Sequence, residues 1–570
     1  MRITLAQINP TIGDLHGNIG LMRRYARSAR DQGADLVVFP ELSLTGYYPG
    51  DLLDEKHFQE RLRSAVRELL LATRETPDLA WVVGLPLEEA TGTSKRWHNG
   101  LQVIQDGHVL TTYRKQLLPT YDVFDERRHF APGPDTSCIL RIAGTRVGFL
   151  ICEDGWNSGQ GDYIRDPWVR LASASPDVVI SINASPWNRG KRDRRHAIFS
   201  QACQAHQIPL IYVNQVGGHD QLVYDGASFA MLPDGQIATE LPSFQEGSET
   251  LQVVHRERCA GAPASASFTS PDGKDLLRGV DRHTHAAAAH AALTLGLRDY
   301  ARRCGFTKAL VGCSGGVDSA LALVLACDAL GSHNVTAITM PSRLSSSGSV
   351  LDSQTLCARN NIELLTYPIS DIVDAFDASS QAALGETARG LARENLQPRI
   401  RATILMTYSN THGHLLLTTG NKSESMVGFC TLGGDTMGGL NVLGDLYKTE
   451  VWEMCRHINA QAGFDRIPRE ILEKAPSAEL AEGQLDSQRL PEYAVLDTIL
   501  KSIIESGRME PEEQTAVDRD MLHVPAEEVE KVKHLIAASE YKRRQSPPIL
   551  RVRARAIGSG RQVPIAAVHF

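Results

Sequence analysis

An α/β fold with two units is predicted for this chain: a mixed sheet with helices outside it, then a parallel sheet covered by helices on both faces. First, short apolar runs alternate with helical patterns along most of the 570 residues. Second, this alternation breaks from Cys259 to Asp281, where Ala, Ser, Pro and Gly leave few large apolar side chains for a core. Third, 42% apolar and 22% charged residues is the composition of a globular protein, which excludes extensive disorder.

In the first half, six apolar runs are predicted to be strands of a mixed sheet. A helix between the first two runs has one apolar face, and Gly33 can end it; that face holds Ile19, Met22, Ala26 and Ala29. Turn signals at Asp106-Gly107 and Pro233-Asp234-Gly235 separate alternating runs and predict two hairpins. The predicted strands are Ile3–Ile8, Asp35–Phe39, Trp81–Leu85, Val147–Ile151, Asp177–Ile182 and Leu210–Val213.

The second half alternates strand and helix patterns more regularly, which predicts a parallel sheet wound on both faces. It opens with an Ala- and Leu-rich helix over Thr284–Cys304, which Gly305 can cap. Another helix is predicted from Val317 to Leu330. The predicted strands are Ala309–Cys313, Val335–Thr339, Ile362–Tyr367 and Leu415–Thr418.

Charge and cysteine content narrow the class of protein. The formal net charge is −8, so no global attraction to nucleic acid or to an anionic membrane is expected, and anionic ligands need local basic or backbone N–H groups. The ten cysteines form no C-x-x-C pair, which argues against a disulfide framework or a zinc ribbon. No signal peptide is recognised, and no run reaches the roughly 18 apolar residues of a membrane span. A cytoplasmic protein is expected.

The segment Leu310–Ser319, LVGCSGGVDS, predicts an anion-binding turn between a buried strand and a helix. Adjacent glycines let the backbone approach a ligand and leave N–H groups of the helix N-terminus facing it. The kinase-type motif G-x-x-x-x-G-K-[ST] is absent, and Asp318 lies in the first helical turn instead. An acid beside a phosphate nest suggests a bridging Mg²⁺. The plainer alternative is a structural turn in which Asp318 only complements the helix dipole.

The residues SGGVDS resemble the loop of ATP pyrophosphatases, which split ATP into AMP and pyrophosphate. NAD synthetases, GMP synthetases, asparagine synthetases and tRNA-thiolating enzymes share this loop. The resemblance implies a doubly wound, adenine nucleotide alpha hydrolase-like domain that binds ATP. The implied ATP contacts in the loop are Gly312, Cys313, Ser314, Gly315, Gly316, Val317, Asp318 and Ser319.

Later segments resemble NAD synthetases in particular. They are LLTTGNKSE, ENLQPRIRA, MGGLNVLGDLYKTEV, PSAEL and the basic run before Pro547-Pro548; Val442 departs from the Pro more usual in that family. This resemblance implies ATP contacts at Thr419 and Lys448. It implies Mg²⁺ ligands at Asp318 and Glu424. It implies deamido-NAD contacts at Asn395, Arg399, Glu424 and Lys542.

The implied chemistry follows from charge. The nicotinate carboxylate of deamido-NAD is a poor acyl donor, so it must attack the α-phosphorus of ATP to form an acyl-AMP anhydride. Departing pyrophosphate needs Mg²⁺, backbone N–H groups and a cation such as Lys448. Ammonia then displaces AMP to form the amide.

In the first half, Glu41, Lys115 and Cys152 each follow a predicted strand or hairpin. A thiol that attacks an acyl group needs a base and a positive group at the developing oxyanion, which Glu41 and Lys115 can supply. For Cys152 alone, the commoner alternative is a buried structural thiol.

The order Glu, Lys, Cys resembles the nitrilase superfamily, which cleaves carbon–nitrogen bonds through a thioester and folds as an αββα sandwich. Within that superfamily the resemblance implies glutamine contacts at Tyr121, Ser185 and Lys191, and an additional acid at Glu126. Glu153 and Asp154 are expected to be held by backbone or cationic partners, since unpaired acids would oppose thiolate formation.

Together the halves resemble the glutamine-dependent NAD⁺ synthetases over nearly the whole chain. The implied organisation is a glutaminase domain at 1–257, a linker at 258–283 and a synthetase domain at 284–570. Glutamine, ATP and deamido-NAD are the implied substrates, with Mg²⁺ and a homo-oligomer of at least two subunits. Two alternatives remain: another adenylating amidotransferase such as a GMP synthetase, and a nucleotide-binding sensor with a vestigial hydrolase half.

Overall fold

The computed structural model describes residues 1–89, 96–157, 163–255, 266–272, 276, 283–558 and 560–567. The chain divides into two compact units. The first comprises residues 1–217 and 224–282, and the second comprises residues 218–223 and 283–570. No helix in the described ranges is both long and apolar enough to cross a membrane.

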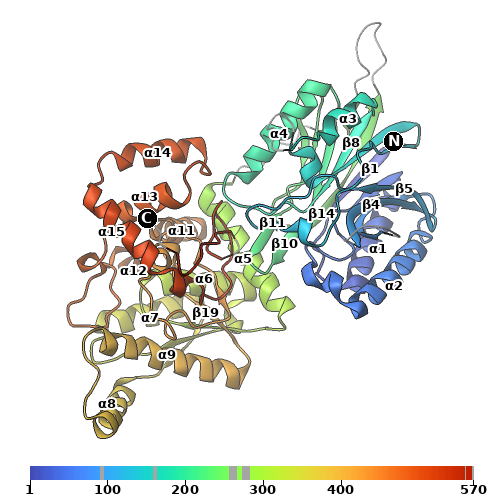
Figure 1. The fold of residues 1–570 in the computed structure, drawn as a ribbon. Helices are drawn as coiled ribbons and strands as arrows, with labels where there is room; N and C mark the ends of the chain where they lie inside the picture. The colour runs from blue at the N-terminus through green and yellow to red at the C-terminus, as the bar shows by residue number, and fades with distance from the viewer. Residues whose placement is uncertain are drawn as a thin grey trace. The chain divides into compact units, whose positions relative to one another are not determined.

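The first unit contains two larger sheets (Figure 1). One has the order β15-β14-β1-β2-β3-β4-β5, with β1 (Arg2–Gln7), β2 (Leu36–Val38), β3 (Ala80–Glu88), β4 (Trp97–Gln105), β5 (His108–Arg114), β14 (Gly247–His255) and β15 (Ala266–Thr269). The other has the order β13-β12-β9-β8-β7-β6, with β6 (Ile139–Ile142), β7 (Thr145–Ile151), β8 (Val178–Asn183), β9 (Leu210–Asn214), β12 (Phe229–Met231) and β13 (Ile237–Glu240). Strands β10 (Val216–His219) and β11 (Leu222–Asp225) form a separate ribbon.

Apolar side chains from both sheets form one core, which makes this unit an αββα sandwich. Leu5 and Val38 of one sheet share a buried cluster with Phe149 and Ile180 of the other. Helices α1 (Leu15–Asp31) and α2 (Lys56–Thr73) pack outside the first sheet, and α3 (Pro167–Ser173) and α4 (Lys191–His206) pack outside the second. The predicted layering is confirmed, as are both hairpins, which join β4 to β5 and β12 to β13.

The expected linker differs from the structure in its middle. Residues 266–269 form β15, which pairs with β14 and extends the first sheet, because the edge of β14 supplies backbone partners that a sequence pattern does not show. Most of the remaining expected linker lies outside the described residues.

The second unit contains a parallel sheet in the order β18-β17-β16-β19-β20. Its strands are β16 (Ala309–Gly312), β17 (Val335–Thr339), β18 (Glu363–Thr366), β19 (Leu415–Thr418) and β20 (Leu440–Asn441). Its helices are α5 (His285–Arg303), α6 (Val317–Leu330), α7 (Ser347–Asn360), α8 (Ser370–Leu384), α9 (Leu391–His412), α10 (Lys422–Val427), α11 (Lys448–Ala462), α12 (Arg469–Glu473), α13 (Tyr493–Ile504), α14 (Pro511–Met521), α15 (Ala526–Ala538) and α16 (Glu540–Arg543).

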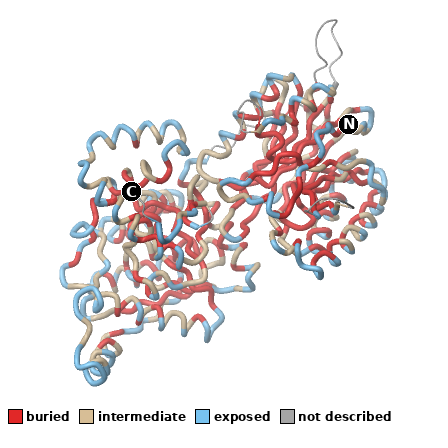
Figure 2. Tube along the Cα trace, in the orientation of Figure 1, coloured by how far each residue is buried: buried red, intermediate tan, exposed pale blue. Residues whose placement is uncertain are grey.

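Helices cover both faces of this sheet, as the sequence predicts. The largely apolar α6 is buried along nearly its whole length and packs against β16, β17 and α5. Leu396 and Ile400 of α9 pack against Leu310 and Ile338 from the strands. Figure 2 shows buried residues concentrated in the strands and in the helices beside them. Strand order reverses between β16 and β19, and ligands bind doubly wound sheets outside the carboxyl ends of strands at such a point.

Candidate active sites

Three buried side chains of the first unit lie just beyond the ends of strands. Glu41 follows β2, Lys115 directly follows β5, and Cys152 directly follows β7. The Nζ of Lys115 donates a hydrogen bond to Oε1 of Glu41 at 2.7 Å. Both side chains are fully buried, and Cys152 is 5% exposed. The fold therefore brings together an acid and an ammonium from segments 74 residues apart.

The thiol of Cys152 lies in the electrostatic field of this pair. Burial raises the pKa of Cys152 well above its usual value; Glu41 raises it further, and Lys115 opposes the rise. Cys152 also has a backbone φ of +45°, which costs a non-glycine residue conformational energy and is a feature of functional turns. The resting thiol is therefore protonated, and its activation needs a base.

A second carboxylate, Glu126, shares Lys115. The Nζ of Lys115 lies 2.6 Å from Oε1 of Glu126. The amide of Asn99, which carries no recognisable sequence motif, donates to Glu41 at 2.7 Å and to Glu126 at 3.2 Å. Burial raises the pKa of Glu126 to about 7, although Lys115 lowers it. Glu126 and Glu41 in turn raise the pKa of Lys115 against the effect of burial, so Lys115 stays charged.

The two acids after Cys152 have different partners. Asp154 accepts hydrogen bonds from the backbone N–H groups of Gln116 at 3.0 Å and Leu117 at 2.8 Å, which is the partner type expected. Glu153 instead accepts hydrogen bonds from the hydroxyls of Tyr121 and Tyr163. Phenol donors depend on how distant segments pack, so the sequence did not indicate them.

The three residues implied as glutamine contacts lie in this unit. Tyr121 is half exposed and reaches Glu153, the neighbour of Cys152. The Nζ of Lys191, at the start of α4, lies 4.1 Å from the ring centroid of Trp156, and burial lowers the pKa of Lys191 to about 8. Ser185 is buried beyond the end of β8.

The second unit has a cavity of about 420 Å³ at the carboxyl ends of β16, β17 and β19. Of the residues implied as ATP, metal or deamido-NAD contacts, those lining the cavity are Gly312, Cys313, Ser314, Gly316, Val317, Asp318, Ser319, Asn395, Thr419, Glu424, Lys448 and Lys542. Gly315 lies behind the wall with a φ of +77°, and a Cβ there would lie 2.3 Å from the carbonyl oxygen of Ser349. Only glycine fits this turn.

Arg399 does not line the cavity, but Arg401 does. Arg399 is exposed and its Nε donates to the carbonyl of Leu432 at 3.1 Å. Arg401 contributes to the cavity wall, its Nε donates to the carbonyl of Met340 at 3.1 Å, and burial lowers its pKa to about 10. Side chains two residues apart on a helix point to nearly opposite sides, so Arg399 and Arg401 cannot both face the cavity.

Lys448 joins the phosphate turn to α10. Its Nζ donates to Oδ2 of Asp318 and, at 3.3 Å, to Oε1 of Glu424. Asn421 holds the other oxygen of Asp318 at 3.0 Å. Burial raises the pKa of Glu424 to about 8, with Lys448 lowering it and Asp318 raising it. Two acids therefore compete for one ammonium.

Asp486, in the cavity wall, is a third acid near Lys448, and no motif indicated it. Its Oδ2 accepts a hydrogen bond from the hydroxyl of Tyr493 at 2.9 Å. Its Oδ1 is buried and has no hydrogen-bond partner among the described residues. Three carboxyl groups therefore surround one ammonium, that of Lys448, and one of their oxygens is unsatisfied. This donor set fits an oxygen-ligated divalent cation.

Lys542 and Asn395 hold loop residues at another part of the cavity wall. The Nζ of Lys542 donates to the carbonyls of Gly428 at 2.7 Å and Cys430 at 2.8 Å. Asn395 accepts a hydrogen bond from Thr431 at 2.8 Å. The resting ammonium of Lys542 therefore has protein partners on the loop that follows α10.

Comparisons with known proteins identify a family for each of the two units. Residues 2–259 match the carbon-nitrogen hydrolase family, and residues 289–546 match the NAD synthase family. Glutamine-dependent NAD(+) synthetases from Synechocystis sp. and Rhodobacter capsulatus are 40% and 39% identical, over 99% of this chain and 98% of each relative. A solved glutamine-dependent NAD⁺ synthetase from Acinetobacter baumannii, in complex with ADP, is 34% identical with a TM-score of 0.75, covering 99% of this chain and 98% of that one. The chain belongs to the glutamine-dependent NAD⁺ synthetase family.

Proposed function

We propose that this protein makes NAD⁺ from deamido-NAD, ATP and glutamine, releasing AMP, pyrophosphate and glutamate. The observation that carries the proposal is that one chain holds an acid–ammonium pair beside a buried thiol and, in its second unit, a cavity lined by a phosphate-type turn. The buried pair of Glu41 and Lys115 beside Cys152 argues against a sensor with a vestigial hydrolase half, since such a protein needs no activated thiol.

In the first unit, Cys152 is the nucleophile of glutamine hydrolysis. Glu41 takes the thiol proton as sulfur attacks the carboxamide carbon, which avoids a free thiolate where burial disfavours charge. Lys115 stabilises the oxyanion. The intermediate expels ammonia, whose nitrogen takes the proton held by Glu41, and a thioester remains. Water then hydrolyses the thioester with Glu41 as base, and the proton that Glu41 accepts returns to the thiol. Asn99 keeps Glu41 oriented.

Glutamine is held by Tyr121, Ser185 and Lys191 in this proposal. Lys191 is the cation among them and suits the α-carboxylate of the substrate. Its Nζ already packs on Trp156, so little side-chain freedom remains to be lost on binding.

In the second unit, ATP lies on residues 312–319 with Thr419 and Lys448, and Asp318 and Glu424 hold Mg²⁺. The bound ion would neutralise phosphate charge and favour the departure of pyrophosphate. The backbone N–H groups at the start of α6 face the phosphates. Lys448, freed from its two acids, donates to the leaving pyrophosphate.

Deamido-NAD is held by Asn395, Glu424 and Lys542, with Arg399 contributing from outside the cavity. An exposed contact of this kind fits a ligand shared with a second subunit, and a dimer is part of the proposal. Light scattering on active enzyme tests it, and a fully active monomer would overturn the dimer. The domain limits 1–257, 258–283 and 284–570 and a cytoplasmic location also belong to the proposal.

One product assay tests the function. Purified protein with glutamine, ATP, Mg²⁺ and deamido-NAD is expected to yield NAD⁺, AMP and pyrophosphate in equal amounts. Replacing deamido-NAD by xanthosine monophosphate, the substrate of a GMP synthetase, is expected to give no AMP. AMP formation with that nucleotide alone would overturn the assignment.

A further inference from the structure

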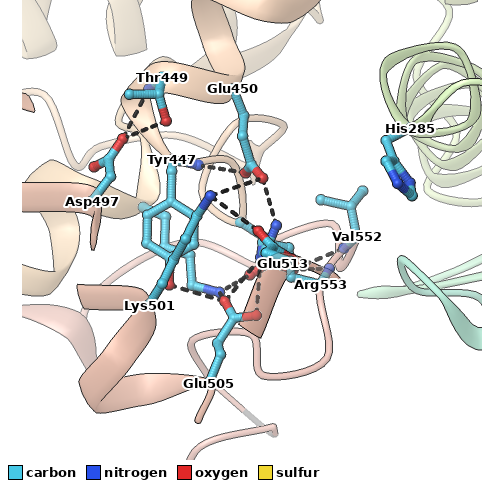
Figure 3. Close-up of polar contacts among 12 residues, drawn as sticks. His285, Tyr447, Thr449, Glu450, Asp497, Lys501, Glu505, Glu513, Val552 and Arg553 are labelled. Atoms are coloured by element: carbon cyan, nitrogen blue, oxygen red, sulfur yellow. Dashed lines mark hydrogen bonds and ion pairs between the residues drawn. The ribbon is translucent and has the colours of Figure 1, made fainter. Parts of the chain in front are cut away.

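A cluster of buried and partly buried charges surrounds Arg553, in the segment that follows α16 (Figure 3). Its centre is Arg553, which is 3% exposed. The guanidinium contacts the carboxylates of Glu450, Glu505 and Glu513. Arg553 does not line the cavity, so it has no direct route to a bound substrate there.

Glu505 connects this cluster to two segments that carry cavity residues. Its Oε1 accepts hydrogen bonds from Nζ of Lys422 at 2.7 Å and from the hydroxyl of Tyr447 at 2.9 Å, in addition to Nε of Arg553 at 3.0 Å. Lys422 lies on α10 two residues before Glu424, and Tyr447 directly precedes Lys448.

Asp445 ties the backbone of the C-terminal segment to the same place. Its Oδ2 accepts hydrogen bonds from the N–H groups of Val552 at 2.8 Å and Arg553 at 2.7 Å. Its Oδ1 accepts from Lys422 at 2.8 Å, and Lys422 also donates to the carbonyl of Arg555 at 2.8 Å.

Further contacts join the two cavity-bearing segments to each other. The hydroxyl of Ser423 accepts a hydrogen bond from the backbone N–H of Lys448 at 2.9 Å. The carboxylate of Glu450 accepts from the N–H of Tyr447 at 3.0 Å while also contacting Arg553. The backbone segments that carry Glu424 and Lys448 are therefore connected to Arg553 through Glu505 and Glu450.

We propose that Arg553 is a positioning residue for adenylation, acting through Glu505 and Glu450 on the segments that carry Glu424 and Lys448. The inference rests on the proposed function. A misplacement of reacting groups by about 1 Å can cost roughly a hundred-fold in rate, while contacts that bind ATP elsewhere persist. The role therefore predicts loss of kcat with little change in KM.

A matched pair of variants tests this proposal. Glu505→Gln and Glu513→Gln each remove one negative charge facing Arg553. Glu505 also contacts Lys422 and Tyr447, and Glu513 also pairs with Lys501. In ammonium-driven AMP formation, we expect Glu505→Gln to lose about 30-fold or more in kcat with KM for ATP within about 3-fold. Glu513→Gln is expected to lose less than about 3-fold. Equal losses in the two variants would overturn the proposal.

Chemical rescue separates positioning from simple loss of folding. Arg553→Gly should regain at least about 10-fold in kcat with millimolar guanidinium, and not with the same concentration of urea. Arg553→Lys, which keeps the charge but not the planar fork, should recover only part of the rate. If Arg553→Gly does not fold, Arg553→Lys carries the test, because Glu505→Gln also removes contacts to Lys422 and Tyr447 that do not involve Arg553. Glutaminase activity in the same samples should stay within about 2-fold.

The controls distinguish this inference from the proposed function. If the unaltered protein makes no NAD⁺, the proposed function fails first. If it does, and Arg553→Lys and Glu505→Gln both keep the kcat of the unaltered protein, only the positioning role is overturned.

Discussion

Lys448 donates a hydrogen bond to Asp318 across 130 residues of sequence. The contact joins the start of α11 to the first turn of α6, and the same ammonium reaches Glu424 on α10. The three side chains meet because parallel strands end at a common edge of the sheet, and α10 and α11 follow strands of that sheet. The ammonium of Lys448 therefore lies between the carboxyl groups of Asp318 and Glu424 in the cavity wall.

Asp318→Asn should slow adenylation, because it removes a carboxylate charge that contacts Lys448 and that, in the proposed function, binds Mg²⁺. We expect AMP formation to fall about 100-fold at low Mg²⁺ and to recover in part at high Mg²⁺. Glutamine hydrolysis should persist, since Asp318 belongs to the second unit. Unchanged ATP consumption with unchanged Mg²⁺ dependence would remove Asp318 from this role.

Cys152→Ala should separate the two reactions. Without the thiol no thioester can form, so glutamine-driven NAD⁺ synthesis should fall at least about 1,000-fold. Synthesis from high ammonium should stay within about 3-fold, because the cavity of the second unit is intact. Loss of both activities in a folded protein would contradict this division of labour.

Lys542→Ala should weaken deamido-NAD use by about 10- to 100-fold in KM or kcat, as for loss of a charge-assisted contact. The resting contacts to Gly428 and Cys430 show that Lys542 also holds the loop after α10. Lys542→Gln, which can keep a hydrogen bond to a carbonyl but has no charge, is the matched control. If the glutamine variant behaves like the unaltered enzyme, the charge has no role in binding.

The KM for glutamine should depend on pH through the charge of Lys191, a residue of the first unit. Its pKa is lowered to about 8 by burial, so its positive charge is present below that pH and lost above it. The KM for glutamine should therefore rise as pH increases from about 7 to about 9. Lys191→Met should have a high KM for glutamine already at pH 7. Its KM should rise further with pH only as much as deprotonation of the substrate amine requires. The same pH profile in both proteins would exclude Lys191 as the carboxylate partner.

The sequence predicts this fold well where periodicity and turn chemistry agree. Helix α6 begins and ends where predicted, at Val317 and Leu330, because a Gly-Gly turn precedes an apolar run and Gly331 follows it. Strand β15 was missed because the short stretch Ala266–Thr269 becomes a strand only beside β14.

The site residues that the sequence missed are isolated polar side chains. Asn99, Arg401 and Asp486 acquire a role only when distant segments bury them, and each resembles an ordinary surface residue in sequence. Arg553 stands among other arginines near the C-terminus, and only the tertiary structure shows that it contacts three acids.

Isotope transfer from glutamine tests the central claim most directly. The protein is incubated with deamido-NAD, ATP, Mg²⁺ and glutamine labelled with ¹⁵N at the amide, and the NAD⁺ formed is measured by mass spectrometry. The account predicts that the nicotinamide amide carries the label and that each labelled molecule is accompanied by one AMP. NAD⁺ without label in an ammonium-free reaction, or hydrolysis of glutamine with no NAD⁺ formed, would contradict it.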